Sequence, residues 1–240
     1  KFKRKFETLL AGRREDAPYD VLMAYSGGKD STSALEVFVN VYKLRVLALT
    51  FDNSFISEQA FNNIRTICAA LHVDRLAASP HPAMLKNIFQ TAARDALFSM
   101  KTLERASAIC TCCIGLVKAV VLRTAIEKGI PFVGFGWSPG QAPVDASVMK
   151  TNPFFVRSAQ KALYDPLLAI AGKAIQPYFL SEEHFKDESR FPWNIHPLAF
   201  LDYDEEKILE RNRELGWKTP EDTDANSTNC LLNALANRIH

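Results

Sequence analysis

Six consecutive residues combine the groups that a phosphate-binding site needs, and they are Ser26, Gly27, Gly28, Lys29, Asp30 and Ser31. Two glycines let the backbone turn sharply and bring its N–H groups close to an anion. Ser31 and Thr32 add hydroxyl groups, and Lys29 adds a mobile positive charge. A helix that begins at about Asp30 would point its positive dipole end at the same anion. The alternative is an ordinary strand–turn–helix connection, but this combination of residue types favours phosphate binding.

The loop requires a strand before it and a helix after it. The apolar run from Val21 to Tyr25 predicts a buried parallel strand, and apolar residues at helical spacing predict a helix over 30–41. A second apolar run predicts another strand, which ends at Asp52. In an open parallel sheet, ligands collect beyond the carboxyl ends of the strands. We therefore expect Thr50, Phe51 and Asp52 to lie where a nucleoside binds, although Asp52 could instead form a turn that caps the next helix.

The segment 26–31 resembles the signature of the PP-loop ATP pyrophosphatases. It differs from a Walker A loop, which needs Gly-x-x-x-x-Gly-Lys-Ser/Thr. Enzymes of this family split ATP between the α and β phosphates and adenylate an oxygen of the substrate. The resemblance implies that Phe51 and Asp52 hold adenine and ribose, and that Mg²⁺ is shared between phosphate oxygens and Asp30 or Asp52. Lys29 would neutralise the charge that develops on the departing pyrophosphate.

Strand and helix patterns alternate along the first 150 residues, and further strands are predicted over 73–78 and 131–136. The predicted helices after the phosphate loop cover 57–71, 83–104, 108–128, 154–171, 204–215 and 230–239. The alternation predicts an α/β fold with a doubly wound, mainly parallel sheet, and the resemblance implies its adenine nucleotide alpha hydrolase-like form. We expect a PP-loop ATP-binding domain over 1–150 and a small, mainly helical C-terminal subdomain over 151–240.

Four of the five cysteines are candidates for chemistry. Cys110 and Cys113 have the Cys-x-x-Cys spacing that lets two thiolates face one metal centre at a helix start, where the helix dipole and a bound cation would lower their pKa values. Together with Cys230 they could hold a [4Fe-4S] cluster with one iron open to a substrate or sulfide. With Cys112 added, four cysteines could close a zinc site. A catalytic thiol pair that uses persulfide chemistry and ordinary core cysteines are the remaining alternatives.

The segment from Cys110 to Gly136 is similar to the matching segment of the iron–sulfur tRNA thiolases. In those PP-loop enzymes a Cys-x-x-Cys and a distant C-terminal cysteine bind a [4Fe-4S] cluster, and the resemblance assigns this role to Cys110, Cys113 and Cys230. It also assigns Gly136 to the nucleotide site. After Gly136 the chain departs from the family, because Trp137 and the residues that follow replace the family's Gly-His turn.

A second resemblance concerns the start of the chain. The segment 19–31 is similar to the beginning of the PP-loop amidotransferases of sugar biosynthesis, which install nitrogen from ammonia that a partner supplies. The sequence therefore leaves open whether the activated acceptor receives sulfur or nitrogen.

Composition limits the setting in which the protein works. The chain has 240 residues and a formal net charge of +2, so a large nucleic-acid surface is permitted but not required. We identify no secretory signal and no apolar run near the roughly 20 residues that cross a bilayer. Five cysteines, uneven and clustered, favour a reducing, cytoplasmic compartment. Because the first residue is Lys1, it stays open whether a segment with a zinc-binding module precedes it.

These patterns predict an ATP-dependent adenylating sulfurtransferase with ATP, Mg²⁺ and a [4Fe-4S] cluster, and Zn²⁺ is the alternative metal. The predicted catalytic residues are Lys29, Asp30, Cys110 and Cys113. The expected partners are ATP, a tRNA or small-molecule acceptor, and a protein that donates sulfur or ammonia, with a homodimer left open. An amidotransferase, a zinc-stabilised nucleotide-binding protein and an RNA-binding adaptor are the alternatives. The polar run Asn226–Asn229 predicts a contact with substrate or phosphate, or a cap for the last helix.

Overall fold

A six-stranded sheet forms the centre of the protein in the computed structural model, which describes residues 1–13, 16–104, 106–224 and 227–239. The strands are β1 (Val21–Ala24), β2 (Val46–Phe51), β3 (Asp74–Ala78), β4 (Phe132–Phe135), β5 (Val148–Lys150) and β6 (Trp193–Ile195). Their order across the sheet is β3-β2-β1-β4-β6-β5. All neighbouring pairs are parallel except β5 and β6. The predicted doubly wound, mainly parallel α/β sheet is confirmed.

The chain reverses its direction across the sheet at β1. From β1 it moves outward to β2 and then β3, and it returns past β1 to form β4 on the other side. Such a reversal leaves a crevice beyond the carboxyl ends of the two strands that flank it, which is where open α/β sheets bind ligands. The residues 26–31 follow β1 and therefore lie at this point.

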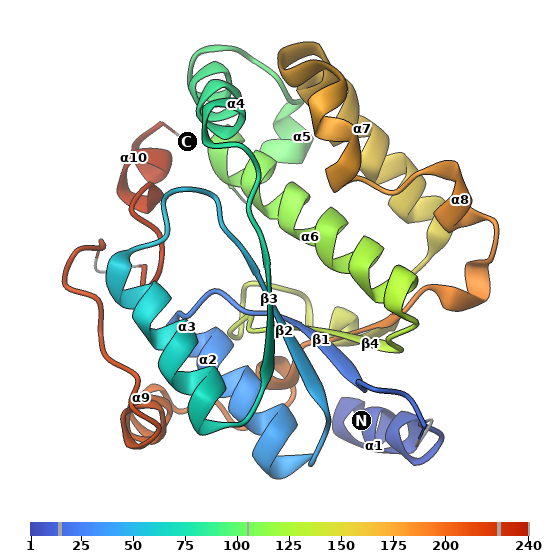
Figure 1. Cartoon of the computed structure of the whole chain (residues 1–240), viewed down its shortest axis with the longest axis vertical. Coiled ribbons are helices and arrows are strands. Elements are labelled where there is room, and N and C mark those ends of the chain that lie inside the picture. Colours follow the sequence, from blue (N-terminus) through green and yellow to red (C-terminus); the bar gives the residue numbers. More distant parts are fainter. Residues whose placement is uncertain (14–15, 105, 225–226, 240) are drawn as a thin grey trace.

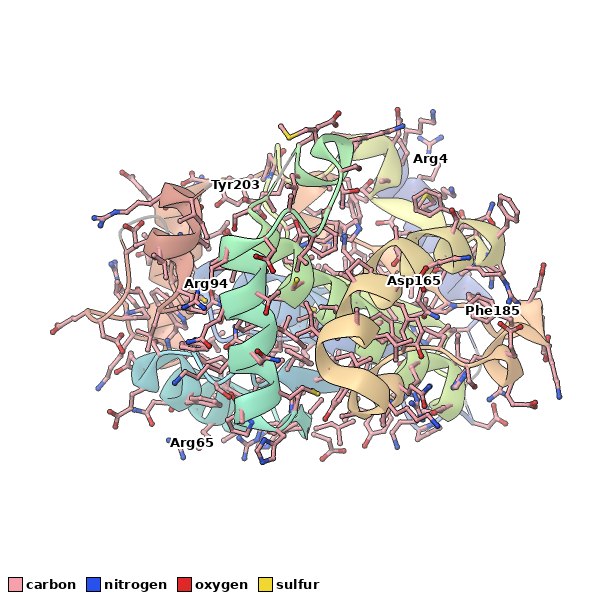
Figure 2. All side chains as sticks on the ribbon, turned by 90° about the horizontal axis from the view of Figure 1, so that it is seen from above. Arg4, Arg65, Arg94, Asp165, Phe185 and Tyr203 are labelled. Atoms are coloured by element: carbon pink, nitrogen blue, oxygen red, sulfur yellow. The ribbon has the colours of Figure 1, made fainter. Side chains whose placement is uncertain are left out.

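Helices cover both faces of the sheet (Figure 1). On one face lie α1 (Phe2–Ala11), α2 (Lys29–Glu36), α3 (Glu58–Ala70) and α9 (Glu205–Glu214). On the other lie α4 (Pro82–Arg94), α5 (Met100–Leu103), α6 (Ala108–Lys128) and α7 (Pro153–Ala171). The short helix α8 (Glu182–Phe185) contacts α6, and α10 (Asn233–Arg238) lies near the C-terminus. Seen from above, α4 and α7 lie side by side, as their contacts also show (Figure 2).

Two hydrophobic cores follow from the alternation of side chains along the strands. Leu22 faces a core that includes residues of α4, α6 and α7. Its neighbours Val21 and Met23 face a second core that includes residues of α1, α2 and α3. Because successive side chains of a strand point to opposite faces, a continuous apolar run is what a strand buried on both faces requires.

Three parts of the predicted secondary structure need correction. The helix predicted over 83–104 is two helices, because the backbone is extended at Asp95 and Ser99 caps the start of α5. The strands β5 and β6 were not predicted, since runs of three residues carry too little alternation to be recognised. β6 comes from the predicted C-terminal subdomain but pairs with β4. The division near residue 150 stays a prediction, and the sheet crosses it.

The helix α6 corrects the expectation that no apolar segment approaches membrane-spanning length. It has 21 residues and is apolar enough, by length and composition, to cross a bilayer. Half of its most apolar window is buried inside the protein, where it packs against β1, β2, α4 and α7. These contacts are those of a core helix.

An ion pair fixes the start of β1 against β2. Asp20 is 1% exposed, and its carboxylate accepts hydrogen bonds from the Arg45 backbone N–H at 2.9 Å and from the Arg45 guanidinium at 2.7 Å. Burial would raise the pKa of Asp20, but the hydrogen bonds and charge of Arg45 outweigh it and hold the pKa below its ordinary value. The stabilisation is therefore present above the unfolded-state pKa near 3.9 and disappears as the pH falls through the folded-state pKa.

We expect Asp20→Asn to lower the free energy of unfolding at pH 7 by about 2 kcal/mol, because hydrogen bonds to a charged group are lost. The difference from the wild type should shrink as the pH falls below about 4. Urea unfolding at pH 7 and pH 3 measures both effects. The exposed Asp95 provides the control, since Asp95→Asn should change the stability by less than about 0.5 kcal/mol at either pH. A pH-independent loss for Asp20→Asn would contradict the electrostatic explanation.

Candidate active site

In the loop between β1 and α2, the position of Gly27 combines a positive φ with a lack of space for a Cβ, so it favours glycine. Gly27 has a φ of +75°, and a Cβ at this position would overlap the Ala60 carbonyl oxygen and lie 2.9 Å from Ile64 Cγ1. Gly28 then serves as the N-cap of α2 with an extended backbone and no capping side chain. The first N–H groups of α2 are therefore not capped by the residue that precedes them, which is the arrangement that anion-binding helix ends use.

The hydroxyl groups of the loop hold its shape. Ser31 Oγ and Thr32 Oγ1 both donate to the Gly28 carbonyl oxygen, at 3.0 and 2.9 Å. Ser31 Oγ also lies 3.1 Å from Ser26 Oγ, and Thr32 Oγ1 lies 3.0 Å from the hydroxyl of the buried Tyr25. These contacts close the turn from both sides, so Ser26 and Ser31 organise the backbone that faces the proposed anion.

The C-terminal part of the chain binds the carbonyl groups of the same loop. The Trp217 indole N–H donates to the Gly27 carbonyl at 2.9 Å, and Asn212 Nδ2 donates to the Lys29 carbonyl at 2.9 Å. Trp217 is 1% exposed and Asn212 is fully buried. Because the carbonyl groups of Gly27 and Lys29 are hydrogen-bonded in this way, the peptide groups of the loop have a fixed orientation.

The Lys29 side chain pairs with residues that the sequence analysis missed. Its ammonium lies 2.8 Å from Glu205, 3.0 Å from the Tyr203 hydroxyl and 3.5 Å from Asp30. Burial would lower the pKa of Lys29, but the hydrogen bonds to Glu205 and Tyr203 and the charge of Asp30 outweigh it and raise the pKa. Tyr203 donates to Asp30 at 2.9 Å and so links the two predicted catalytic residues. Lys29 is thus a fixed cation beside the loop.

The polar run near the C-terminus contacts the loop directly. Thr228 Oγ1 accepts a hydrogen bond from the Lys29 backbone N–H at 3.0 Å. Ser227 Oγ accepts from the Cys230 backbone N–H at 3.2 Å, while α10 begins after Leu232 without a side-chain cap. Among the described residues of this run, 227–229, none is observed to cap α10. Asn226 lies outside the described residues.

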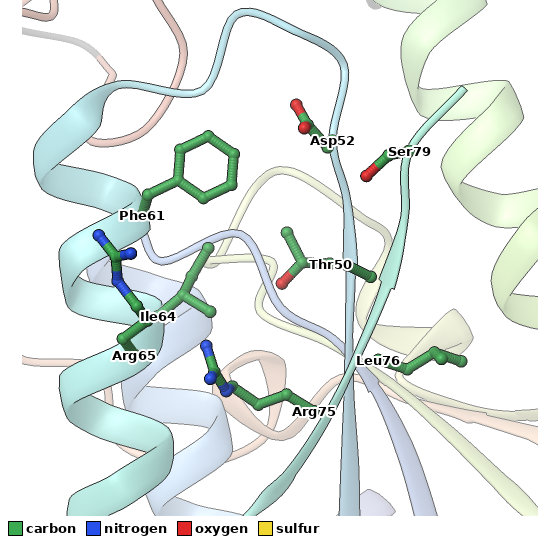
Figure 3. Close-up of a pocket in the computed structure, with 9 residues that line it drawn as sticks. Thr50, Asp52, Phe61, Ile64, Arg65, Arg75, Leu76 and Ser79 are labelled. Atoms are coloured by element: carbon green, nitrogen blue, oxygen red, sulfur yellow. The ribbon is translucent and has the colours of Figure 1, made fainter. Parts of the chain in front are cut away.

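A pocket of about 330 Å³ lies between α3 and the ends of β2 and β3 (Figure 3). Its lining consists of Thr50, Asp52, Phe61, Ile64, Arg65, Arg75, Leu76, Ala77 and Ser79. Ile64 also lies next to Gly27, so one side chain of the pocket wall packs against the loop. Asp52 accepts from the Ser54 backbone N–H at 2.8 Å, so it forms a turn and lines the pocket at once. The Phe51 side chain instead packs into the core on the opposite face of the sheet.

Gly136 brings the end of β4 against the start of α2. A Cβ at Gly136 would overlap Ser31 Cα and lie 2.6 Å from the Ser31 nitrogen. Both are backbone atoms and cannot move without displacing the loop. Gly136 is expected at the nucleotide site by resemblance, and this contact gives a packing reason for glycine at this position.

Two of the three candidate thiols, those of Cys113 and Cys230, lie beside Asn53, the residue after Asp52. Cys110 and Cys113 lie one turn apart near the start of α6, where Ser107 caps the helix. Asn53 Nδ2 lies 3.4 Å from Cys113 Sγ and 3.9 Å from Cys230 Sγ. Its other amide atom, Oδ1, accepts from the Phe55 backbone N–H at 2.8 Å, which fixes the N–H₂ group toward the sulfurs. Asn53 was not predicted, because an isolated asparagine after a strand usually indicates only a turn.

The remaining two cysteines lie in the cores. Cys112 is fully buried in the core beneath α6, and Cys68 is 1% exposed in the core on the other face. Burial raises the pKa of Cys112 and that of Cys68 to about 12. A four-cysteine zinc site that uses Cys112 would require this side chain to leave the core, so the three-cysteine alternative agrees better with the packing.

Burial also governs the thiols that face Asn53. It raises the pKa of Cys113 to about 12 and raises the pKa of Cys230, and the nearby thiols add to both shifts. For Cys113, this corrects the expectation that the helix dipole lowers the pKa. Three thiols are a suitable donor set for zinc or an iron–sulfur cluster. Within the described residues, however, no three His, Cys, Asp or Glu side chains form a group that could already hold a metal ion.

Comparisons with known proteins give distant similarities. No family model matches the chain. A curated protein of Methanocaldococcus jannaschii, "Uncharacterized protein MJ1599", is 24% identical over 237 residues, which are 98% of this chain and 66% of that protein. The chain thus spans slightly less than two thirds of the length of this relative.

Two solved structures are similar over nearly the whole chain. The U34-tRNA thiolase NcsA from Methanococcus maripaludis, solved with its [4Fe-4S] cluster, has 18% identity and a TM-score of 0.46, and the match covers 99% of this chain and 69% of that one. The NMN synthetase from Francisella tularensis has 14% identity and a TM-score of 0.38, with 100% of this chain and 93% of that one covered.

We expect Gly136→Ala to destabilise the protein by about 1–3 kcal/mol, because the added methyl group overlaps backbone atoms of Ser31. Urea unfolding measures the loss. Gly12→Ala is the matched control, since a Cβ at Gly12 would lie 3.8 Å from the Leu9 carbonyl oxygen, an ordinary contact. Equal stability of the two variants would show that β4 and α2 can separate without cost.

Proposed function

We propose that the protein is an ATP-dependent adenylating sulfurtransferase. It would convert ATP to AMP and pyrophosphate and transfer sulfur to a tRNA base or a small metabolite. The observation that carries this proposal is the position of the three thiols. Cys113 and Cys230 lie beside Asn53, and Cys110 precedes Cys113 by one helical turn. Asn53 directly follows Asp52 of the pocket, and Ile64 of the same pocket lies next to Gly27 of the loop.

The loop would bind the β and γ phosphates of ATP. The N–H groups at the start of α2 supply donors, and the helix dipole favours the negative charge. Lys29 would stabilise the charge on departing pyrophosphate, for which its fixed position and raised pKa suit it, since it stays protonated near neutral pH. Mg²⁺ would be shared between the phosphate oxygens and the carboxylate of Asp30 or Asp52.

The pocket would hold the nucleoside. Phe61 and Ile64 offer apolar surface for a base, and Asp52 offers a carboxylate for the ribose hydroxyls. A carbonyl oxygen of the acceptor then attacks the α phosphorus, and the bond to the β-phosphate oxygen breaks, so that pyrophosphate leaves. In the second step a sulfur nucleophile attacks the activated carbon, and AMP departs with the former carbonyl oxygen.

Cys110, Cys113 and Cys230 would hold a [4Fe-4S] cluster. When bound by three protein thiolates, such a cluster keeps one iron available for an external sulfur ligand. The chain's own contribution is to gather the thiols at the end of β2 and to direct the Asn53 amide donor at two of them. A tRNA or small molecule would accept the sulfur, and a sulfur-donor protein would supply it. A homodimer is compatible with this reaction.

Two other functions use the same loop. A PP-loop amidotransferase would add ammonia to the adenylate and would not need the thiols. A zinc-stabilised nucleotide-binding protein would use the thiols for structure and release no pyrophosphate. The two predictions below separate these alternatives, because one measures pyrophosphate release and the other measures the metal.

We expect Lys29→Ala to reduce the formation of AMP and pyrophosphate from ATP by roughly 100-fold or more, because the cation beside the leaving group is lost. Pyrophosphate release in the presence of a candidate acceptor is the measurement. Lys161→Ala, on the exposed side of α7, should keep the wild-type rate. An unchanged rate in a folded Lys29→Ala protein would remove Lys29 from the mechanism.

We expect each single replacement of Cys110, Cys113 or Cys230 by Ala to remove most of the iron and acid-labile sulfide taken up in anaerobic reconstitution. Elemental and sulfide analysis measures the content, and Cys68→Ala is the control because Cys68 lies in the opposite core. A wild-type chain that takes up neither iron nor sulfide would sink the cluster proposal. Stoichiometric zinc without pyrophosphate release would favour the zinc-stabilised protein.

A further inference from the structure

The described segment 227–232 connects the two halves of the candidate active site. At one end, Thr228 accepts the hydrogen bond from the Lys29 backbone N–H. Two residues later, Cys230 lies beside Asn53 and the other thiols. A contact at the phosphate loop and a contact at the cysteines are therefore made by one short piece of chain.

The Thr228 hydroxyl lies where a phosphate oxygen would lie. Lys29 is the first residue of α2, so its N–H is one of the donors that an anion at the helix start would use. Thr228 Oγ1 is 3.0 Å from this nitrogen, and a Cβ at Gly28 would be only 2.9 Å from the same oxygen. One N–H makes one good hydrogen bond, so a phosphate oxygen at 2.7–3.2 Å from the nitrogen would have to displace the hydroxyl.

The exchange is favourable on energetic grounds. A hydrogen bond between an amide and a neutral hydroxyl contributes about 1 kcal/mol, whereas a bond to a charged oxygen is roughly twice as strong. The α2 dipole adds to the preference for the anion. A phosphate group should therefore displace Thr228 as the acceptor of the hydrogen bond from the Lys29 N–H.

Two backbone hydrogen bonds join the segment to residues 55–57. The Asn229 carbonyl accepts from the Ser57 backbone N–H at 3.0 Å, and the Leu231 backbone N–H donates to the Phe55 carbonyl at 2.9 Å. Between them, Cys230 and Ile56 form an isolated antiparallel bridge. Because Thr228 and Cys230 flank Asn229, a displacement of Thr228 would shift Cys230 and weaken its bridge to Ile56.

We propose that Thr228 is an internal ligand of the phosphate loop, which the phosphate end of the nucleotide displaces, and that this displacement moves Cys230 relative to Cys110 and Cys113. The proposal rests on the proposed binding of ATP phosphates at the loop. It makes phosphate binding and the arrangement of the three thiols thermodynamically coupled, so that each one changes the equilibrium of the other.

Inorganic pyrophosphate is the probe, and isothermal titration calorimetry gives its affinity for the wild type, Thr228→Ala and Thr228→Ser. We expect Thr228→Ala to bind pyrophosphate roughly fivefold more tightly, because a competing hydrogen bond of about 1 kcal/mol is removed. Thr228→Ser retains the hydroxyl and should bind like the wild type. Unchanged or weaker binding by Thr228→Ala would overturn the proposal and leave the loop as a phosphate site, whereas absence of binding in all three proteins would overturn the proposed function itself.

Hydrogen–deuterium exchange tests the movement of the cysteine segment. We expect pyrophosphate to increase exchange in a peptide that contains residues 227–232 of the wild type, because the Leu231 N–H loses its partner at Phe55. Thr228→Ala should show the increased exchange before pyrophosphate is added. A peptide from α4 (Pro82–Arg94) is the control and should not respond. Exchange in 227–232 that pyrophosphate leaves unchanged or lowers would overturn the coupling to Cys230.

Discussion

The orientation of the three peptide groups from Gly27 to Asp30 is the constraint on which the candidate active site depends. A phosphate-binding turn needs its N–H groups to converge, and this requires that the carbonyl groups point elsewhere and find partners there. Trp217 and Asn212 provide those partners from the far end of the chain. Gly136 and Ser31 are packed too closely for the helix start to shift. The loop is short, but the whole fold determines its shape.

The sheet explains why two kinds of chemistry lie so close together. Asp52 and Asn53 are consecutive residues at the end of β2, and their side chains serve different neighbours. Asp52 lines the pocket beside α3, whereas the Asn53 amide faces Cys113 and Cys230. No linker or second domain is needed to bring the pocket near a thiol. The distance between the two chemistries is fixed by the backbone of a single strand end.

Local sequence patterns predicted those parts of the fold and of the site that depend on interactions between residues close in sequence. The Val21–Tyr25 run, the two glycines and the Cys-x-x-Cys spacing each depend on neighbours within a few residues. Tyr203, Glu205 and Thr228 could not be predicted as partners of Lys29, because their contacts span 170 residues or more and only the folded chain brings them there. The predicted direction of the Cys113 pKa shift was wrong for a related reason. Burial depends on tertiary packing, and its effect on the pKa outweighed that of the helix dipole.

Trp217 gives the loop an optical signature. Its indole is buried, and the indole N–H is bonded to the Gly27 carbonyl, so its emission wavelength depends on whether that carbonyl keeps its place. Trp137 and Trp193 lie at the ends of other strands and emit from different surroundings. In a chain where both are replaced by phenylalanine, the fluorescence of one residue would follow the turn in real time. The same bond that shapes the site would thus make its rearrangements visible without a label.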